Sequence, residues 1–239
     1  MKTLRKIFAI AACLAATVQV AAAADAPQIV EIDHIAPGPA GGWYLRGDIG
    51  YVIATDPKAT YGGTAVNFVN EALKPTWMIG AGVGYQFNPW FRADLTVDYR
   101  FASKFTGNTV CGGCGLSVER QKLSTTTFLV NAYVDIATWQ GFTPYVGVGA
   151  GVAYHWLHDL IGFNPGGGVT IVPDGGTWTW AAAAMTGVSF PVGENMLIDA
   201  GYRYLWLGNA KSGADGIGNR VEYSGLSNHE LRIGGRRTF

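Results

Sequence analysis

The chain has 239 residues, with 17 Lys and Arg side chains balanced by 17 Asp and Glu side chains. Gly contributes 34 residues and aromatics 13 %, but charged residues only 14 %, against about 25 % in a typical soluble domain. This composition excludes a disordered chain, a nucleic-acid binder and a charge-coated soluble globule. We therefore expect no nucleic-acid partner.

The first 24 residues have the three parts of a secretory signal peptide. A basic start with Lys2, Arg5 and Lys6 precedes an apolar stretch over 7–20, and small residues lead up to Ala24. We expect cleavage after Ala24, which leaves 14 basic side chains (17 − 3) against 17 acidic ones, a net charge of −3. An uncleaved N-terminal anchor is the alternative, and the shortness of the apolar stretch argues against it.

Residues 25–41 form a Pro-containing lead segment without clear periodicity, which we expect to lie in the periplasm. Beyond it, apolar and polar residues alternate with a period of two, which is typical of β-strands. The pattern is clearest over 91–101, and Asn88-Pro89 predicts a tight turn before this stretch. The alternation predicts eight strands, over 43–54, 76–87, 90–103, 122–137, 143–157, 177–191, 196–207 and 228–239.

The connections between the predicted strands alternate between long and short. Short turns on one side and long polar loops on the other are typical of an outer-membrane barrel. We predict an all-β fold, an eight-stranded antiparallel up-and-down transmembrane β-barrel over 42–239. The long loops, expected outside the cell, cover 55–75, 104–121, 158–176 and 208–227.

Charged residues gather on one face of the predicted strands, among glycines, and the other face carries bulky apolar side chains. A soluble β-sandwich is the alternative, but six charges of each sign on one face favour a neutralised network inside a barrel. An eight-stranded lumen is just wide enough for side chains to fill it. The predicted lumen network consists of Arg46, Asp48, Arg92, Asp94, Asp98, Arg100, Asp135, Asp199, Arg203, Glu230, Arg232 and Arg236.

Large aromatic residues fall at the ends of the predicted strands rather than at their middles. Two belts of aromatic side chains are expected where a barrel crosses the two membrane–water interfaces. The predicted interface aromatics are Trp43, Trp90 and Trp139 on the periplasmic side, Trp77, Trp156, Trp178 and Trp206 on the exterior side, and Phe239.

Two cysteines remain after signal cleavage, Cys111 and Cys114, in a Cys-Gly-Gly-Cys stretch. In an oxidising compartment such a pair predicts a small-loop disulfide, here in the second exterior loop. A redox-active pair and a zinc site are alternatives. The sequence around the pair lacks the βαβ pattern of a thioredoxin-like motif, and two thiols alone are a weak zinc signal.

Two stretches resemble a known family. Residues 42–51 (GWYLRGDIGY) resemble the first strand, and residues 144–151 (PYVGVGAG) the fifth strand, of small alphaproteobacterial outer-membrane proteins of the opacity-protein and outer-membrane immunogenic protein group. The resemblance covers essentially the whole mature chain. It implies the outer membrane of a Gram-negative bacterium, with membrane lipid and lipopolysaccharide around the barrel.

The C-terminus resembles a barrel-assembly signal, with Arg232, Gly234 and the terminal Phe239 in place. This implies that the last strand is recognised by the barrel-assembly machinery. Arg237 departs from the signal, because an apolar residue usually stands there. We expect its guanidinium to reach water at the membrane interface.

We expect no enzymatic activity, no catalytic residue, no cofactor and no metal site. A barrel-type lipid deacylase would need His and Ser close together on the lipid face, and no His-x-Ser stretch occurs. An outer-membrane protease would need an Asp and His group at the rim of a ten-stranded barrel. His158-Asp159 lies near the predicted rim, but eight strands are predicted.

The resulting functional hypothesis is a structural outer-membrane protein that supports envelope integrity and surface display. The first alternative is an adhesin or a ligand-binding protein whose exterior loops contact a host or matrix ligand. Aromatic and apolar loop residues compatible with such contact are Tyr61, Phe68, Val69, Phe163 and Ile171. The second alternative is a narrow porin, which the filled lumen argues against.

Overall fold

The computed structural model describes residues 41–61, 66–111, 115–163, 168–214, 218 and 220–239. The cleavage site predicted after Ala24, the lead segment up to residue 40 and Cys114 lie outside the described residues, so these expectations stay predictions. Within the described residues, no helix is long and apolar enough to cross a membrane.

The strands are β1 (Gly42–Ala54), β2 (Lys58–Tyr61), β3 (Val66–Leu73), β4 (Thr76–Asn88), β5 (Phe91–Cys111), β6 (Gly115–Asp135), β7 (Thr143–Phe163), β8 (Val169–Val172), β9 (Gly175–Pro191), β10 (Met196–Leu207), β11 (Ala210–Lys211), β12 (Val221–Ser224) and β13 (Ser227–Thr238).

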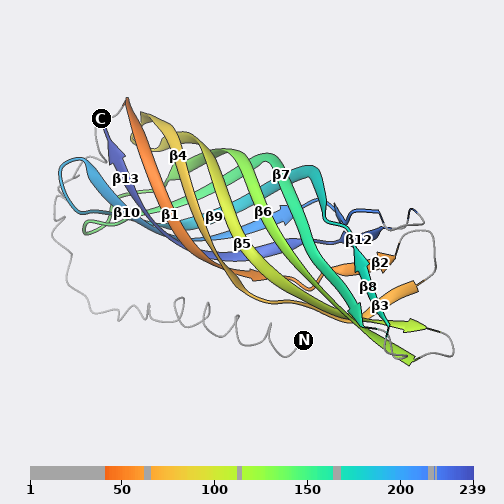
Figure 1. Ribbon diagram of the computed structural model, residues 1–239. Coiled ribbons are helices and arrows are strands. Elements are labelled where there is room, and N and C mark those ends of the chain that lie inside the picture. Colours follow the sequence, from red (N-terminus) through yellow and green to blue (C-terminus); the bar gives the residue numbers. More distant parts are fainter. Residues whose placement is uncertain (1–40, 62–65, 112–114, 164–167, 215–217, 219) are drawn as a thin grey trace, which may run out of the picture. The chain divides into compact units, whose positions relative to one another are not determined.

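Eight of these strands close into an antiparallel barrel (Figure 1). Around the ring the order is β1, β4, β5, β6, β7, β9, β10 and β13, and β13 pairs with β1 from Asn228↔Ala54 to Thr238↔Tyr44. Closure by the first and last strands leaves no free edge in the ring, which is what a membrane-spanning sheet requires. The predicted fold class is confirmed.

The short connections all lie at one end of the barrel, here called the turn end. In the turn between β4 and β5, the Asn88 side-chain oxygen accepts hydrogen bonds from the backbone amides of Trp90 (3.0 Å) and Phe91 (2.8 Å). Residues 136–142 and 192–195 make the other two short turns. The C-terminus lies at this end, and β2, β3, β8 and β12 gather at the opposite end, the loop end (Figure 1).

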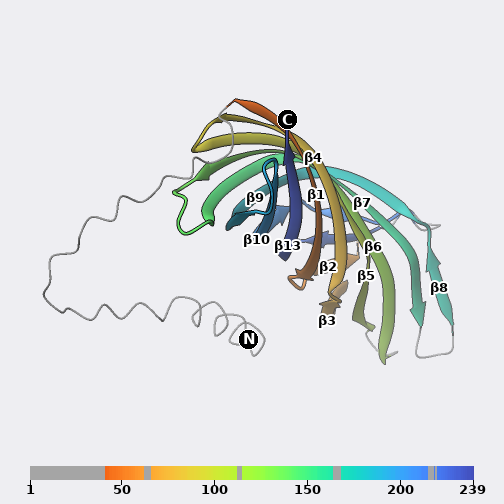
Figure 2. The same ribbon diagram turned by 90° about the vertical axis from the view of Figure 1, so that its left-hand side faces the viewer.

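The structure corrects the predicted exterior loops, because most of their described residues form β-strands. β5 and β6 continue as a hairpin far past the predicted ends at 103 and 122, with pairs from Lys104↔Lys122 to Cys111↔Gly115. β7 likewise continues to Phe163 and pairs with β8 (Figure 2). Apolar residues in these stretches, such as Leu160 and Ile161 on β7, fall on both faces, so polar–apolar alternation does not mark them as strands. Pairing of the two arms nevertheless satisfies the backbone hydrogen-bonding groups.

Glycines on the lumen side make room for large neighbours on the adjacent strand. Gly80 pairs with Asp98, and a Cβ at Gly80 would collide with the Asp98 carboxylate. A Cβ at Gly84 would likewise collide with the Tyr44 ring. The alternating glycines of β4 therefore allow long polar side chains to fill a narrow lumen.

Candidate functional site

The structure places all twelve charged side chains of the predicted lumen network inside the barrel. Each of them is at most 9 % exposed. Exposed apolar residues such as Leu95 and Val97 alternate with them and point outward. We call these twelve residues the charged layer.

The middle of the charged layer is a chain of ion pairs across three strands. The Asp98 carboxylate lies 2.8 Å from Arg203 and 2.9 Å from Arg232. Glu230 lies 2.6 Å from both Arg203 and Arg100. Because each buried charge has an opposite partner, the layer avoids the large cost of an isolated charge in a low-dielectric interior.

Arg46 extends this chain toward β5 and β6. Its guanidinium lies 2.8 Å from Asp48 and 3.0 Å from Asp94, and it donates a 3.0 Å hydrogen bond to the Tyr133 hydroxyl. Asp48 in turn lies 3.2 Å from Arg232, so the two groups of ion pairs form one network.

Tyrosines, which the sequence analysis missed, complete the layer nearer the turn end. The Arg92 guanidinium lies 3.2 Å from Asp135 and stacks over the rings of Tyr133 (4.0 Å to the centroid) and Tyr145 (4.8 Å). Both tyrosines occupy lumen-facing positions of their strands. Their place in the period-two alternation is the sequence feature that could have identified them as lumen residues. Arg236 and Asp199 form a separate pair at 3.4 Å.

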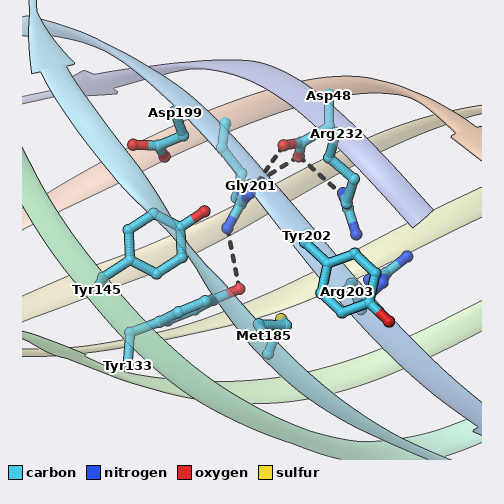
Figure 3. Close-up of a pocket in the computed structure, with 10 residues that line it drawn as sticks. Asp48, Tyr133, Tyr145, Met185, Asp199, Gly201, Tyr202, Arg203 and Arg232 are labelled. Carbon is cyan, nitrogen blue, oxygen red and sulfur yellow. Dashed lines mark hydrogen bonds and ion pairs between the residues drawn. The ribbon is translucent and has the colours of Figure 1, made fainter. Parts of the chain in front are cut away.

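Little space remains between these side chains. Figure 3 shows Tyr133, Tyr145, Asp48 and Arg232 around a residual cavity of about 10 Å³. That volume holds about one water molecule. The charged layer is therefore packed and offers no room for a solute.

An apolar layer, also missed in the sequence analysis, fills the lumen on the loop-end side of the charges. Along β10 the inward-facing side chains change from Arg203 to Leu205 and Leu207, which are 0 % and 6 % exposed. A gap of about 20 Å³ remains within this layer. We call it the apolar plug, and its large members are Leu73, Phe105, Leu123, Leu157, Leu205, Leu207 and Leu226.

Beyond the plug, the ends of β5, β6 and β7 join β2, β3, β8, β11 and β12 in a loop-end extension, and its buried side chains belong to the same hydrophobic cluster as the plug. The Phe105 ring lies 6.1 Å from Phe68 and 4.9 Å from Tyr223 in edge-on contacts. The buried Tyr223 hydroxyl donates a hydrogen bond to Gln121 Oε1, and burial raises the pKa of this hydroxyl. The extension is thus packed onto the plug.

The five residues proposed for ligand contact divide into two groups. Phe68 is buried in the core of the extension, which corrects its assignment to a contact surface, and Tyr61 is half-buried. Val69, Phe163 and Ile171 are exposed, Ile171 most strongly at 74 %.

The predicted interface aromatics all lie on the outer wall and are between 42 % and 66 % exposed. Several of them contact tyrosine rings edge-on. The ring centroids of Trp43 and Tyr85 lie 5.3 Å apart, and those of Trp206 and Tyr204 lie 4.6 Å apart. Trp180, which the prediction omitted, is 59 % exposed on β9, two residues from Trp178.

The remaining predictions concern metal ligands, histidines and the cysteine pair. No group of three His, Cys, Asp or Glu side chains that would hold a metal ion occurs in this part of the chain. His155 is buried against the Thr125 hydroxyl (2.9 Å), whereas His158 lies near the loop end beside exposed Asp159. The Cys111–Cys114 disulfide stays a prediction because Cys114 is outside the described residues.

At the C-terminus, Arg237 is exposed on the outer wall at the turn end. Its guanidinium lies 5.6 Å from the centroid of the Phe239 ring. The Phe239 amide donates a 3.0 Å hydrogen bond to the Trp43 carbonyl, so the last residue extends the pairing of β13 with β1.

Residues 8–239 match the family model described as outer membrane protein beta-barrel domain. An uncharacterized protein of Brucella abortus is 33 % identical, with 95 % of each chain covered. A putative adhesin of Rickettsia bellii is 28 % identical over 80 % of this chain and 86 % of its own length. The outer membrane protein PagN of Salmonella typhimurium is 29 % identical over 54 % of this chain and 56 % of its own length.

Solved structures with the same fold include two outer-membrane proteins, each 16 % identical. OprG from Pseudomonas aeruginosa has a TM-score of 0.52, with 86 % of this chain and 99 % of that chain covered. AlkL, solved in lipid bilayers, has a TM-score of 0.50, with 93 % and 97 % covered. With the closed ring, the apolar outer wall and the family match, the chain belongs to the outer membrane β-barrel domain family and is an outer-membrane β-barrel protein.

Proposed function

We propose that the chain is a sealed outer-membrane barrel that displays its loop-end extension on the cell surface as an adhesin-type contact surface. The proposed orientation has the turn end facing the periplasm and the loop end facing the exterior. In outer-membrane barrels the short turns face the periplasm and the long connections face the exterior. Export relies on the signal peptide predicted before Asp25.

The observation that carries the proposal is the continuity of packing from the lumen into the extension. Phe105 belongs to the apolar plug and also contacts Phe68 and Tyr223 in the extension. A surface held this firmly has little conformational entropy to lose on binding, and binding sites commonly lie on connections that a rigid scaffold positions. The adhesin name of the Rickettsia bellii relative supports the same role.

A binding assay on whole cells tests the proposal. A bacterium that otherwise does not adhere would express the protein and be measured for retention on cultured cells and on matrix-coated plates. We expect retention to fall to background when residues 107–119 are replaced by a short Gly-Asn turn, which removes the outer part of the β5–β6 hairpin. Rebuilding the periplasmic turn at 192–195 is the matched control and leaves retention unchanged. Equal retention by all three strains contradicts the contact role.

Envelope support, contact with lipopolysaccharide and delivery by the barrel-assembly machinery complete the proposal. They are tested together by deletion of the gene and of the terminal Phe239. We expect deletion of the gene to sensitise cells to detergent, and removal of Phe239 to lower the amount of heat-modifiable folded barrel in the outer membrane.

The porin alternative makes the opposite prediction for conductance. Because the charged layer and the apolar plug leave gaps of only about 10 and 20 Å³, we expect no steady channel current in planar bilayers. A steady, large current from the unmodified protein would replace the sealed-barrel proposal with a porin.

A further inference from the structure

The outward face of the extension carries an apolar patch near β8. Two rows of paired residues cross β6, β7 and β8 there: Val118↔Phe163↔Val169 and Arg120↔Ile161↔Ile171. The five apolar members are between 36 % and 74 % exposed, and the Arg120 guanidinium lies over the Phe163 ring. Contiguous exposed apolar residues of this kind mark interaction sites.

A charged row separates this patch from the aromatic belt of the membrane wall. Between Trp156 and Ile161 on β7 lie His158 and Asp159, and Asp159 forms an exposed ion pair with Lys122 (2.8 Å). Charged side chains at this level place the patch above the lipid, so membrane lipid does not cover it.

The patch ends at a strand edge that is open among the described residues. β8 pairs with β7 on one side, and no described strand pairs with its other side (Figure 2). The sequence of β8, Val-Thr-Ile-Val, holds none of the Lys or Pro residues that protect open edges. Such an edge is a template for one more strand.

Gly41, the first described residue, donates a hydrogen bond to the Gln86 carbonyl at the turn end, the end opposite β8.

We propose that the open edge of β8 binds an extended strand of another polypeptide by β-strand addition. Its alternate apolar side chains extend the rows that end in Val169 and Ile171, and a Lys or Arg faces exposed Asp174 just beyond β8. Asp174 accepts a hydrogen bond from the Asp159 amide (3.2 Å) and forms no ion pair with a described residue. Backbone pairing supplies affinity and the alternate side chains supply specificity.

This inference rests on the proposed function, because it needs the loop end to face outward. A purified-protein assay keeps the two separate. A library of random ten-residue peptides would be panned on the full chain in lipid vesicles, and enriched peptides measured by fluorescence anisotropy. We expect enriched peptides to alternate apolar residues and to carry a basic residue at one end.

Three comparisons decide the outcome. Ile171→Lys, which protects the edge with a charge, is expected to weaken binding roughly tenfold or more, whereas Val192→Lys in the periplasmic turn leaves it unchanged. Asp174→Lys is expected to shift enrichment to peptides with an acidic end. Failure to enrich peptides, equal binding by Ile171→Lys, or equal binding of a backbone N-methylated copy of the peptide overturns the proposal, whether or not cells adhere.

Discussion

Along β10, the inward-facing side chains change from Asp199 and Arg203 to Leu205 and Leu207 within a few residues. On the turn-end side of this change, the lumen is filled by six cations and six carboxylates in ion pairs. On the loop-end side, it is filled by leucines and Phe105. One barrel therefore has a polar interior and an apolar interior, one above the other.

The difference shows how one scaffold meets two demands. Charged side chains lock strands into register because each buried charge is costly without its specific partner. Apolar side chains exclude water and join the barrel to the core of the extension, because burial is favourable for any well-packed neighbour. The charged layer thus specifies partners, and the apolar plug seals the lumen.

The largest expected loss comes from breaking the charged layer. Asp98→Ala leaves Arg203 and Arg232 without their shared carboxylate and is expected to lower the free energy of unfolding by about 3–5 kcal/mol. Urea unfolding in lipid vesicles measures the change. Glu222→Ala is the matched control, because its ion pair with Lys211 is exposed, and its unfolding midpoint is expected to match the unmodified protein. Equal behaviour of the two variants would show that the buried network adds nothing specific.

Leu205→Ala tests the apolar plug by leaving a cavity beside the charged layer. We expect a loss of about 2–5 kcal/mol in the same unfolding assay, since Leu205 is fully buried. Leu205→Met, which nearly conserves volume, is expected to lose less than about 1.5 kcal/mol. If the Ala variant is as stable as the Met variant, the plug is loosely packed and the contrast between the layers disappears.

Leu95→Arg tests the outer wall against the interior of the same strand. Leu95 is 51 % exposed and pairs with exposed Val130 midway between the aromatic belts. A charge there is expected to cost about 2–4 kcal/mol, whereas Phe87→Arg beside the turn at the end of β4 is expected to cost about 0–1 kcal/mol. Tolerance of both substitutions would mean that this wall does not face lipid.

The smallest effect concerns the exposed carboxyl of Asp159 near the loop end. The hydrogen bond and charge of Lys122 lower the pKa of the Asp159 carboxyl. The stabilisation of the folded state by this ion pair is therefore fully present above the ordinary carboxyl pKa. It is lost as the pH falls through the lowered pKa. A carboxyl NMR titration should show this lowered midpoint, and Lys122→Gln should return it toward the ordinary value. An unchanged midpoint in Lys122→Gln would assign the shift to another group.

Period-two alternation by itself located the eight barrel strands, and the charges on one face identified the lumen side. The strand prediction is confirmed. Charged side chains such as Arg100 and Asp98 lie buried within the barrel, because a charge is costly on a wall that faces lipid. The turn at Asn88-Pro89 was predictable as well, since its residues carry a local preference that needs no partner.

Only the tertiary structure decided the apolar plug and the extension. Leu205 faces the lumen and Leu95 faces lipid, although the two side chains are chemically identical. Where both faces of a strand are apolar, the polar–apolar pattern of the sequence does not distinguish the lumen face from the lipid face. The strands beyond Ser103 form because Lys104 to Cys111 find hydrogen-bonding partners in the opposite arm of the hairpin. Such pairing depends on the opposite arm of the hairpin, so the preference of each residue taken alone does not encode it.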